Sequence, residues 1–186
     1  SARQLGAYAL VERIGVGGMG EVWRATHRLL RRPAAIKVVR PELLGHSDDA
    51  RTRSLTRFER EAQAIATLES PHTIKLFDFG VADDGSPFYV MELLRGIDVQ
   101  HLVDEFGPLP PERAVHFLLQ ACDSLTEAHS EGLVHRDIKP SNLFVGPRAS
   151  EHDVLRVLDF GLVLQRAVAE TGTAESGGQI QGTPST

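Results

Sequence analysis

The order of apolar and polar residues predicts a chain of short strands with two amphipathic helices among them. Near the start, residues 8–14 and 21–25 alternate imperfectly, which predicts a hairpin with the glycine-rich stretch 15–20 at its tip. The apolar run 34–39 predicts a buried strand that carries one charge, Lys37. Further strands are expected where apolar residues run together, at residues 74–77, 88–91 and 154–158.

The first helix is predicted over residues 53–68, where apolar residues recur at spacings of three and four. Glu61 lies within about 60° of this apolar stripe, so its carboxylate is expected to face the protein rather than water. A buried carboxylate without a partner is costly, which makes Glu61 a candidate for an ion pair. Glu59, on the other side of the stripe, is the alternative.

The second helix is predicted to begin at the Pro110-Pro111-Glu112 sequence and to end at Gly132. Its apolar stripe places Cys122 in the core as a packing residue. The stripe consists of Val115, Leu118, Leu119, Cys122, Leu125 and His129.

Composition is that of an ordinary globular chain, with 41% apolar and 24% charged residues. The net charge of −5 argues against a broad basic surface for nucleic acid or membrane, although local patches remain compatible with it. A single cysteine permits no internal disulfide and fits a reducing compartment. We find no run of about 18 apolar residues and no charged-then-apolar leader, so we expect a cytoplasmic location, with any membrane anchor beyond residue 186.

The stretch His135–Asn142 concentrates an acid, a lysine and an asparagine directly after the second helix. Asp137 could accept the proton of an attacking hydroxyl, Lys139 could hold a moving phosphoryl group, and Asn142 offers a neutral oxygen to a metal. A plain turn with solvated charges is the alternative. The triplet Asp159-Phe160-Gly161 follows a predicted strand and supplies a second carboxylate, which favours the catalytic interpretation.

Gly15, Gly17 and Gly20 form a G-x-G-x-x-G pattern, whose backbone N–H groups can approach phosphate oxygens. The pattern alone is weak, because dinucleotide-binding folds and plain turns share it. In a dinucleotide fold the glycines should open a helix, whereas residues 21–25 are predicted to form a strand. This favours a lid over phosphates and argues against a dinucleotide-dependent oxidoreductase.

In the order of these motifs the chain resembles the eukaryotic-like protein serine/threonine kinases, particularly the bacterial ones. The resemblance implies an α+β, bilobal, protein-kinase-like fold. Residues 1–94 would form a smaller lobe of antiparallel sheet with one main helix and the start of the hinge. Residues 95–186 would form an incomplete, mostly helical larger lobe, because the A-P-E motif has not been reached at Thr186. Helices that cover the second helix in the family would then be missing, so Leu118, Leu119 and Leu125 are expected to be partly exposed.

The resemblance also implies ATP and Mg²⁺ as cofactors, serine and threonine hydroxyls of proteins as substrates, no nucleic-acid partner, and self-association for autophosphorylation. Lys37 would hold the α- and β-phosphates and pair with Glu61, while Asp137 orients the hydroxyl near Lys139. Asn142 and Asp159 would hold magnesium. The nucleotide-binding residues would be Gly15, Gly17, Gly18, Gly20, Val22, Ala35, Lys37, Met91, Glu92, Leu94, Asp98 and Phe144, with Val22 over the adenine, the backbones of Glu92 and Leu94 on its edge, and Asp98 at the ribose.

Two further interpretations follow from the same resemblance. His135 and Phe160 would belong to a column of apolar contacts with Ile65 and Leu76 above them. Arg136 would receive a phosphate from the activation segment, where Thr171, Thr173 and Ser176 are candidates and Thr183 would brace the catalytic stretch.

Asp78-Phe79-Gly80 repeats the magnesium triplet but is predicted to be a strand end before a turn at residues 83–86. The rival function is a kinase-like ATP-binding or scaffolding module without turnover.

Overall fold

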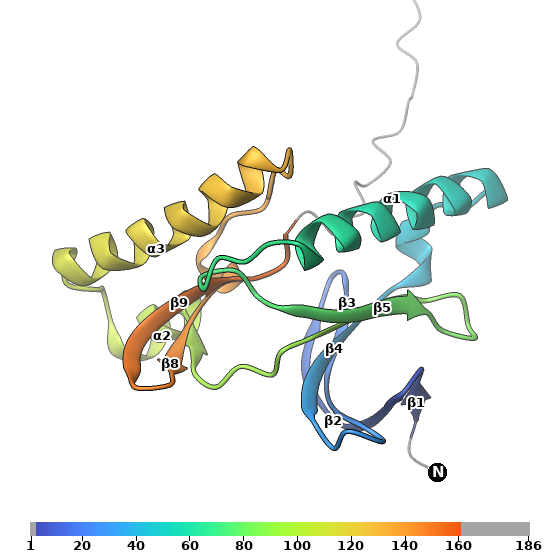
Figure 1. Cartoon of the computed structure of the whole chain (residues 1–186), viewed down its shortest axis with the longest axis horizontal. Helices are drawn as coiled ribbons and strands as arrows, with labels where there is room; N and C mark the ends of the chain where they lie inside the picture. Colours follow the sequence, from blue (N-terminus) through green and yellow to red (C-terminus); the bar gives the residue numbers. More distant parts are fainter. Residues whose placement is uncertain (1–2, 161–186) are drawn as a thin grey trace, which may run out of the picture.

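The computed structural model describes residues 3–160, which form two antiparallel sheets with helices packed beside them (Figure 1). The larger sheet has six strands in the order β1-β2-β3-β4-β6-β5, each antiparallel to its neighbour. Its strands are β1 (Gln4–Leu5), β2 (Tyr8–Gly17), β3 (Gly20–His27), β4 (Pro33–Val39), β5 (Leu76–Val81) and β6 (Pro87–Met91).

The predicted glycine-rich hairpin is confirmed as the turn between β2 and β3. Gly17 pairs with Gly20 across the hairpin, so only two residues form its tip. Gly20 has a φ of 151°, and a Cβ there would come within 1.9 Å of the Val38 carbonyl oxygen. Glycine at this position therefore lets the hairpin lie close against β4.

Helix α1 (Asp48–Ala66) follows the short 3₁₀ helix η1 (Pro41–Leu44) and packs against β5 and β6. It begins earlier than predicted because the Ser47 hydroxyl caps it, accepting a hydrogen bond from the Ala50 N–H at 3.2 Å. The helix buries Phe58, Ala62 and Ile65, as the apolar spacing predicts. The α1 face that carries these residues is therefore fixed against the larger sheet.

The smaller sheet has the strand order β7-β8-β9 and packs against helix α3. It contains the strand predicted at residues 154–158, which ends one residue earlier than expected. Its elements and their neighbours are β7 (Ile97–Asp98), α2 (Val99–Phe106), α3 (Pro111–Ser130), η2 (Pro140–Asn142), β8 (Leu143–Arg148) and β9 (Glu151–Val157).

The helix α3 is confirmed, but its predicted core stripe is wrong except for Leu125, which is partly buried against the core cluster. Its buried residues are Phe117, Ala121, Ser124 and Ala128. Cys122 is exposed, and so is not a core residue in this structure. Gln120 fastens α3 to β9, because it donates to the Asp153 carbonyl and accepts from the Leu155 N–H. Five of the six members of the predicted stripe are exposed: Val115 (54%), Leu118 (59%), Leu119 (66%), Cys122 and His129. The exposure of Leu118 and Leu119 agrees with the separate expectation that these leucines are partly exposed.

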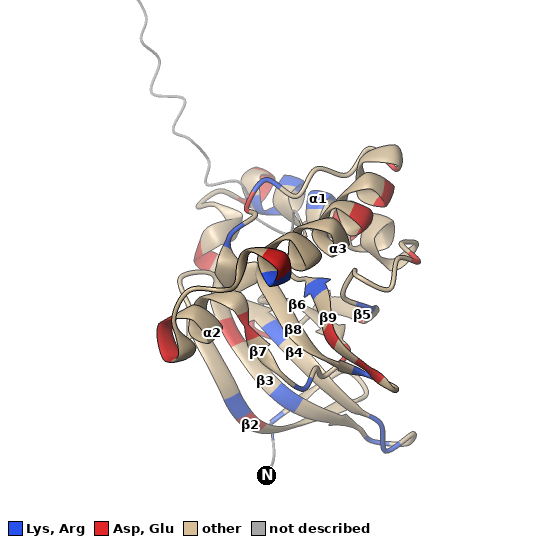
Figure 2. Ribbon diagram, turned by 90° about the vertical axis from the view of Figure 1, so that its left-hand side faces the viewer, with Lys and Arg blue, Asp and Glu red and all other residues tan. Residues whose placement is uncertain are grey.

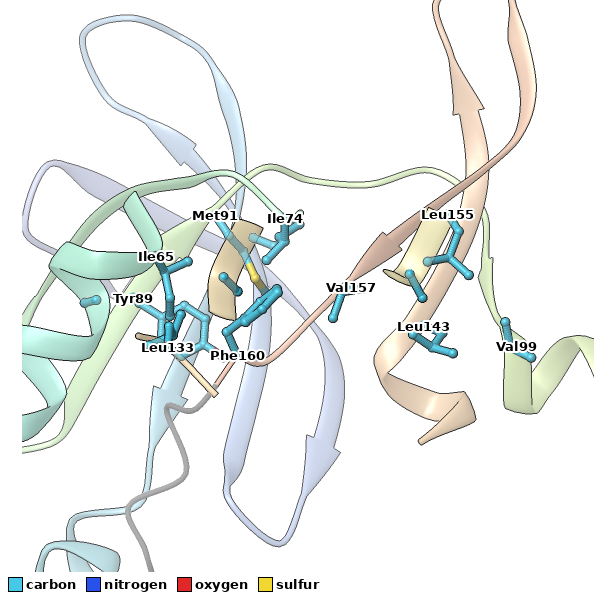
Figure 3. Packing of buried hydrophobic residues seen from close by; sticks show 14 of the residues in the cluster. Ile65, Ile74, Tyr89, Met91, Val99, Leu133, Leu143, Leu155, Val157 and Phe160 are labelled. Atoms are coloured by element: carbon cyan, nitrogen blue, oxygen red, sulfur yellow. The ribbon is translucent and has the colours of Figure 1, made fainter. Parts of the chain in front are cut away.

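One apolar cluster spans both sheets (Figure 3). Ile65, Met91 and Phe160 gather at one end, while Leu143 and Leu155 lie at the other. The rings of His135 and Phe160 lie 4.9 Å apart, which agrees with the apolar column expected at this place. A second cluster, which includes Leu10, Ile36 and Val90, packs within the larger sheet. Within residues 3–160, every helix is too short or too polar to cross a bilayer.

Candidate active site

A cleft of about 660 Å³ lies beneath the glycine-rich hairpin, and it contains every predicted site residue except Glu61. This volume is within the range of small-molecule binding sites. Eight further residues line the cleft that the sequence did not identify as site residues: Ile14, Val16, Met19, Ile74, Leu93, His101, Ser141 and Leu158. The predicted residues in its lining are Gly15, Gly17, Gly18, Gly20, Val22, Ala35, Lys37, Met91, Glu92, Leu94, Asp98, Asp137, Lys139, Asn142, Phe144 and Asp159. The structure thus brings them together, and their individual roles remain predictions.

The upper wall of the cleft is built by the pairing of β3 with β4. Val22 stands opposite Lys37 in the register, and Ala35 pairs with Met91 of β6. Because alternate residues of a strand share a face, Ala35 and Lys37 both face the cleft, as predicted. The wall therefore offers an apolar surface for a flat base, followed by a cation.

Lys37 forms an ion pair with Asp159, and this corrects the predicted pairing with Glu61. Its Nζ lies 2.5 Å from Asp159 Oδ2, and the two side chains are only 12% and 25% exposed. The buried Tyr89 hydroxyl donates to the other oxygen, Oδ1, at 2.6 Å. Burial and the neighbouring Asp159 charge raise the pKa of Tyr89 well above its usual value, so it remains a hydrogen-bond donor. Both carboxylate oxygens of Asp159 are therefore engaged.

Glu61 lies outside the cleft lining, on α1. It is half-buried, and desolvation raises its pKa, while the positive charges of Arg57 and Arg136 oppose that rise. The alternative Glu59 is exposed. In this position of α1, the Glu61 carboxylate lies close enough to Arg136 of the catalytic stretch for their charges to interact. Asp159 is the partner of Lys37, where Glu61 was expected.

The catalytic stretch is held together by hydrogen bonds around Asp137. Lys139 Nζ lies 2.8 Å from Asp137 Oδ2, and the Asn142 amide nitrogen donates to the Asp137 carbonyl oxygen at 2.8 Å. The hydrogen bond and charge of Lys139 hold the pKa of Asp137 below its usual range, although burial opposes the shift. Asp137 is therefore an ionised acceptor at neutral pH. Its carboxylate is suited to orienting a hydroxyl and receiving its proton late in a reaction.

His135 supports this loop from below rather than serving as a base. Its Nε2 lies 2.7 Å from the Leu158 carbonyl oxygen, and its Nδ1 accepts from the Asp137 N–H at 3.2 Å. Burial is the main cause that lowers the pKa of His135, so the ring is neutral at pH 7. This agrees with the predicted packing role.

The oxygen donors near the catalytic stretch fit magnesium bound together with a phosphate. Asn142 commits its amide nitrogen to Asp137, which leaves the amide oxygen as the end available to a cation. Residues 3–160 contain no group of three or more His, Cys, Asp and Glu side chains placed to hold a metal. Mg²⁺ is usually held by one or two protein oxygens plus substrate phosphates, so Asn142 and Asp159 suit it. Each Asp159 oxygen accepts one hydrogen bond here and keeps a second lone pair that a cation can share.

The segment after β6 lines the cleft, and the expected backbone contacts of Glu92 and Leu94 with adenine stay predictions. The Glu92 carboxylate accepts from the Lys75 N–H at 3.1 Å and lies 3.5 Å from Arg156 Nε, so this side chain fastens the segment to its neighbours. Asp98 caps α2 by accepting from the His101 N–H at 3.0 Å, and its other oxygen lies 2.6 Å from His101 Nδ1. A ribose at Asp98 would therefore also meet His101.

The second Asp-Phe-Gly triplet, at residues 78–80, is a strand segment and not a metal site. Asp78-Phe79-Gly80 lies within β5, away from the cleft lining, and the turn after it is closed by the Ser86 N–H, which donates to Asp84. The duplicate triplet is thus a strand segment, as expected. The predicted phosphorylation sites Thr171, Thr173 and Ser176, and the bracing residue Thr183, lie outside the described residues.

A glycine hairpin over a lysine-bearing strand, with a His-Arg-Asp loop and a second aspartate facing them, defines a kinase-type nucleotide site. A family model described as protein kinase domain matches residues 8–179, and the chain belongs to this family. Among curated proteins, it is 39% identical to the serine/threonine-protein kinase pkn3 of Myxococcus xanthus over 178 residues. That match covers 95% of this chain and 32% of the relative. It is 37% identical to the serine/threonine-protein kinase PknB of Mycolicibacterium smegmatis, over 90% of this chain and 25% of the relative.

Solved structures agree with the fold. The PknI kinase domain of Mycobacterium tuberculosis superposes with a TM-score of 0.72 at 30% identity, covering 87% of this chain and 62% of that one. A structure of Rad53 residues 1–466 with AMP-PNP gives a TM-score of 0.70 at 24% identity, over 84% of this chain and 38% of that one, and shows likeness of fold alone. The expected fold class is thereby confirmed. The chain spans about a quarter to a third of the curated relatives it matches.

Proposed function

We propose that the protein carrying this chain is an ATP-dependent serine/threonine kinase that transfers the γ-phosphate of ATP to protein hydroxyls. The observation that carries the proposal is the convergence of the glycine-rich hairpin, Lys37, Asp137, Asn142 and Asp159 on one cleft. We place the boundary between the two lobes after Leu94, at the end of the segment that follows β6. Self-association would allow one copy to phosphorylate another.

In the proposed reaction the substrate hydroxyl oxygen forms a bond to the γ-phosphorus while the bond from that phosphorus to the β–γ bridging oxygen breaks, and ADP leaves. Asp137 accepts a hydrogen bond from the hydroxyl, orients it, and receives its proton. Lys139, already 2.8 Å from Asp137, lies where it can neutralise charge on the moving group. Magnesium, when bound, would neutralise the β- and γ-phosphates.

The alternative is a nucleotide-binding module without turnover, and one observation favours it. Lys37 is paired with Asp159 rather than Glu61, and each Asp159 oxygen accepts a hydrogen bond from a protein group that a metal would compete with. In protein kinases the lysine–glutamate pair and the metal-bound aspartate must both be in place for transfer. A chain held in the present arrangement would bind nucleotide without reacting.

Asp137→Asn in the full-length protein tests the two functions. Nucleotide affinity should change little, whereas single-turnover transfer of γ-phosphate should fall by about 10²-fold or more, because a positioned base is removed. Asp78→Asn, in the duplicate triplet outside the cleft, is the matched control and should keep wild-type transfer. Nucleotide binding without transfer by the wild-type protein would support the alternative, and transfer at wild-type rate by Asp137→Asn would remove Asp137 from the mechanism.

A further inference from the structure

The turn between β3 and β4 presents two leucines to solvent between arginines. We name Arg28–Arg32, with the sequence Arg-Leu-Leu-Arg-Arg, the arginine–leucine tip. Leu29 is 87% exposed, more than any other large apolar side chain in residues 3–160, and Leu30 is 70% exposed. Adjacent apolar side chains that are this exposed form a candidate contact surface, because covering them would remove apolar area from water.

The tip is a closed, bonded turn, so the exposure of its leucines is built into the fold. The His27 N–H donates to the Arg32 carbonyl at 2.9 Å, and the Arg31 N–H donates to the His27 carbonyl at 2.9 Å. The Leu30 N–H donates to His27 Nδ1 at 3.1 Å. Arg31 has a φ of 54°, in the left-handed region that non-glycine residues seldom occupy. The backbone therefore holds both leucines outward instead of folding them onto the sheet.

Positive charge surrounds the leucines, although the whole chain has a net charge of −5. Residues 24–33 contain four arginines and no acidic residue, and arginine colouring marks the turn at the end of the β3–β4 hairpin (Figure 2). The Arg32 guanidinium lies 3.5 Å from the centre of the Phe77 ring, which fixes it at the base of the tip. A groove of about 480 Å³ opens beside the tip and is lined by Ala7, Ala9, Thr26, Arg28, Leu29 and Arg31.

The size of this surface favours a lipid bilayer over a protein partner. A specific protein interface buries about 800 Å² on each partner around an apolar core, whereas the tip offers only two adjacent leucines. A bilayer interface accepts a few apolar side chains, while neighbouring arginines contact the phosphates of the headgroups. The bilayer surface must carry negative charge, because Arg28 and Arg31 are positively charged.

We propose that the arginine–leucine tip is a peripheral membrane contact, in which Leu29 and Leu30 enter the interfacial layer of an anionic phospholipid bilayer. Arg28 and Arg31 then lie at the headgroup phosphates on either side of the leucines. This contact is independent of the nucleotide cleft, and it requires no spanning segment. The six-stranded sheet, which carries both the tip and the glycine-rich hairpin, would then lie at the membrane surface.

Sedimentation of the 186-residue chain with vesicles tests the proposal. The chain should bind vesicles of phosphatidylglycerol and phosphatidylcholine and should bind pure phosphatidylcholine vesicles at least about tenfold more weakly, because each arginine contributes about fivefold at an anionic surface. Leu29→Ser/Leu30→Ser should reduce binding to the anionic vesicles by about tenfold or more. Arg28→Gln/Arg31→Gln should reduce it as well and should flatten its dependence on salt.

Leu118 and Leu119 on α3 provide a matched control, since they are also adjacent and exposed, at 59% and 66%, but belong to a different face. Leu118→Ser/Leu119→Ser should bind anionic vesicles within about twofold of wild type, because exposed substitutions leave the fold unchanged. Equal losses in the two leucine variants would overturn the proposal, as would wild-type binding by Leu29→Ser/Leu30→Ser or no binding to anionic vesicles at all. If the tip variants instead lost binding to an acidic polypeptide alone, the surface would be a protein contact and the lipid assignment wrong.

Discussion

Replacing Lys37 by methionine should destabilise the free chain mainly through the loss of its ion pair with Asp159. The two side chains are 12% and 25% exposed, and their N–O distance is 2.5 Å. Removing one partner of a fully buried pair costs about 3–5 kcal/mol, and an exposed pair contributes about 0–1 kcal/mol. Asp159 keeps its hydrogen bond from Tyr89 and some contact with water. We therefore expect a loss of about 1–3 kcal/mol.

A double-mutant cycle measures the pair directly. Denaturant unfolding of wild type, Lys37→Met, Asp159→Asn and the double variant should give a coupling energy of about 1–2 kcal/mol. A parallel cycle with Glu61→Gln should give a coupling within about 0.5 kcal/mol of zero, because Glu61 lies outside the cleft lining of the free chain. Lys75→Met changes an exposed lysine near the same sheet and should leave the unfolding free energy within about 0.5 kcal/mol. A Lys37–Glu61 coupling as large as that of Lys37–Asp159 would refute this assignment of partners.

Two further substitutions test the surroundings of these charges. Tyr89→Phe frees Asp159 Oδ1 from a charge-assisted hydrogen bond of roughly 1.5 kcal/mol, so it should lower the melting temperature of the unliganded chain and tighten Mg-ATP binding by up to about tenfold. A thermal-shift titration measures both effects, with Tyr8→Phe as the control. Weaker Mg-ATP binding by Tyr89→Phe would contradict the role of the hydroxyl. Because burial raises the folded pKa of Glu61 above its ordinary value of 4.5, the folded chain binds more protons than the unfolded chain between these two values, and stability falls as pH rises through that window. Glu61→Gln should therefore raise the melting temperature above the window and change it little below pH 4.5, and a gain that is equal at all pH values would contradict this cause.

The parts of the site that depend on local pattern could be predicted from the sequence. Alternation of apolar residues located the glycine-rich hairpin, and a period of two placed Ala35 and Lys37 on one face. Asp137, Lys139 and Asn142 lie so close in sequence that one short loop must bring them together, and hydrogen bonds between them confirm it. In each case a few consecutive residues decide the geometry.

The buried face of α3 could not be predicted in the same way. Hydrophobic periodicity favours the helix face with the most large apolar side chains, whereas the buried face of α3 consists mainly of small residues. Ala121, Ser124 and Ala128 expose little apolar area, yet their small side chains allow the helix to approach the structure beneath it closely. Ser124 also forms a buried hydrogen bond with Thr73 at 2.7 Å. These contacts come from segments distant in sequence, so a pattern within the helix does not contain them.

The partner of Lys37 depends on the placement of α1, which is also a long-range property. The segment after α1 is fastened to α3, because the Glu127 carboxylate accepts from the N–H groups of Glu69 and Ser70 at 2.7 and 2.8 Å. The end of α1 nearest this segment is thus tied to α3 through Glu69 and Ser70. The Lys37 ammonium group has three N–H donors, and its contact with Asp159 uses one of them. A shift of α1 that brings Glu61 to one of the remaining donors would allow the pairing, and a cation drawn to the Asp159 carboxylate would favour it by competing with Lys37.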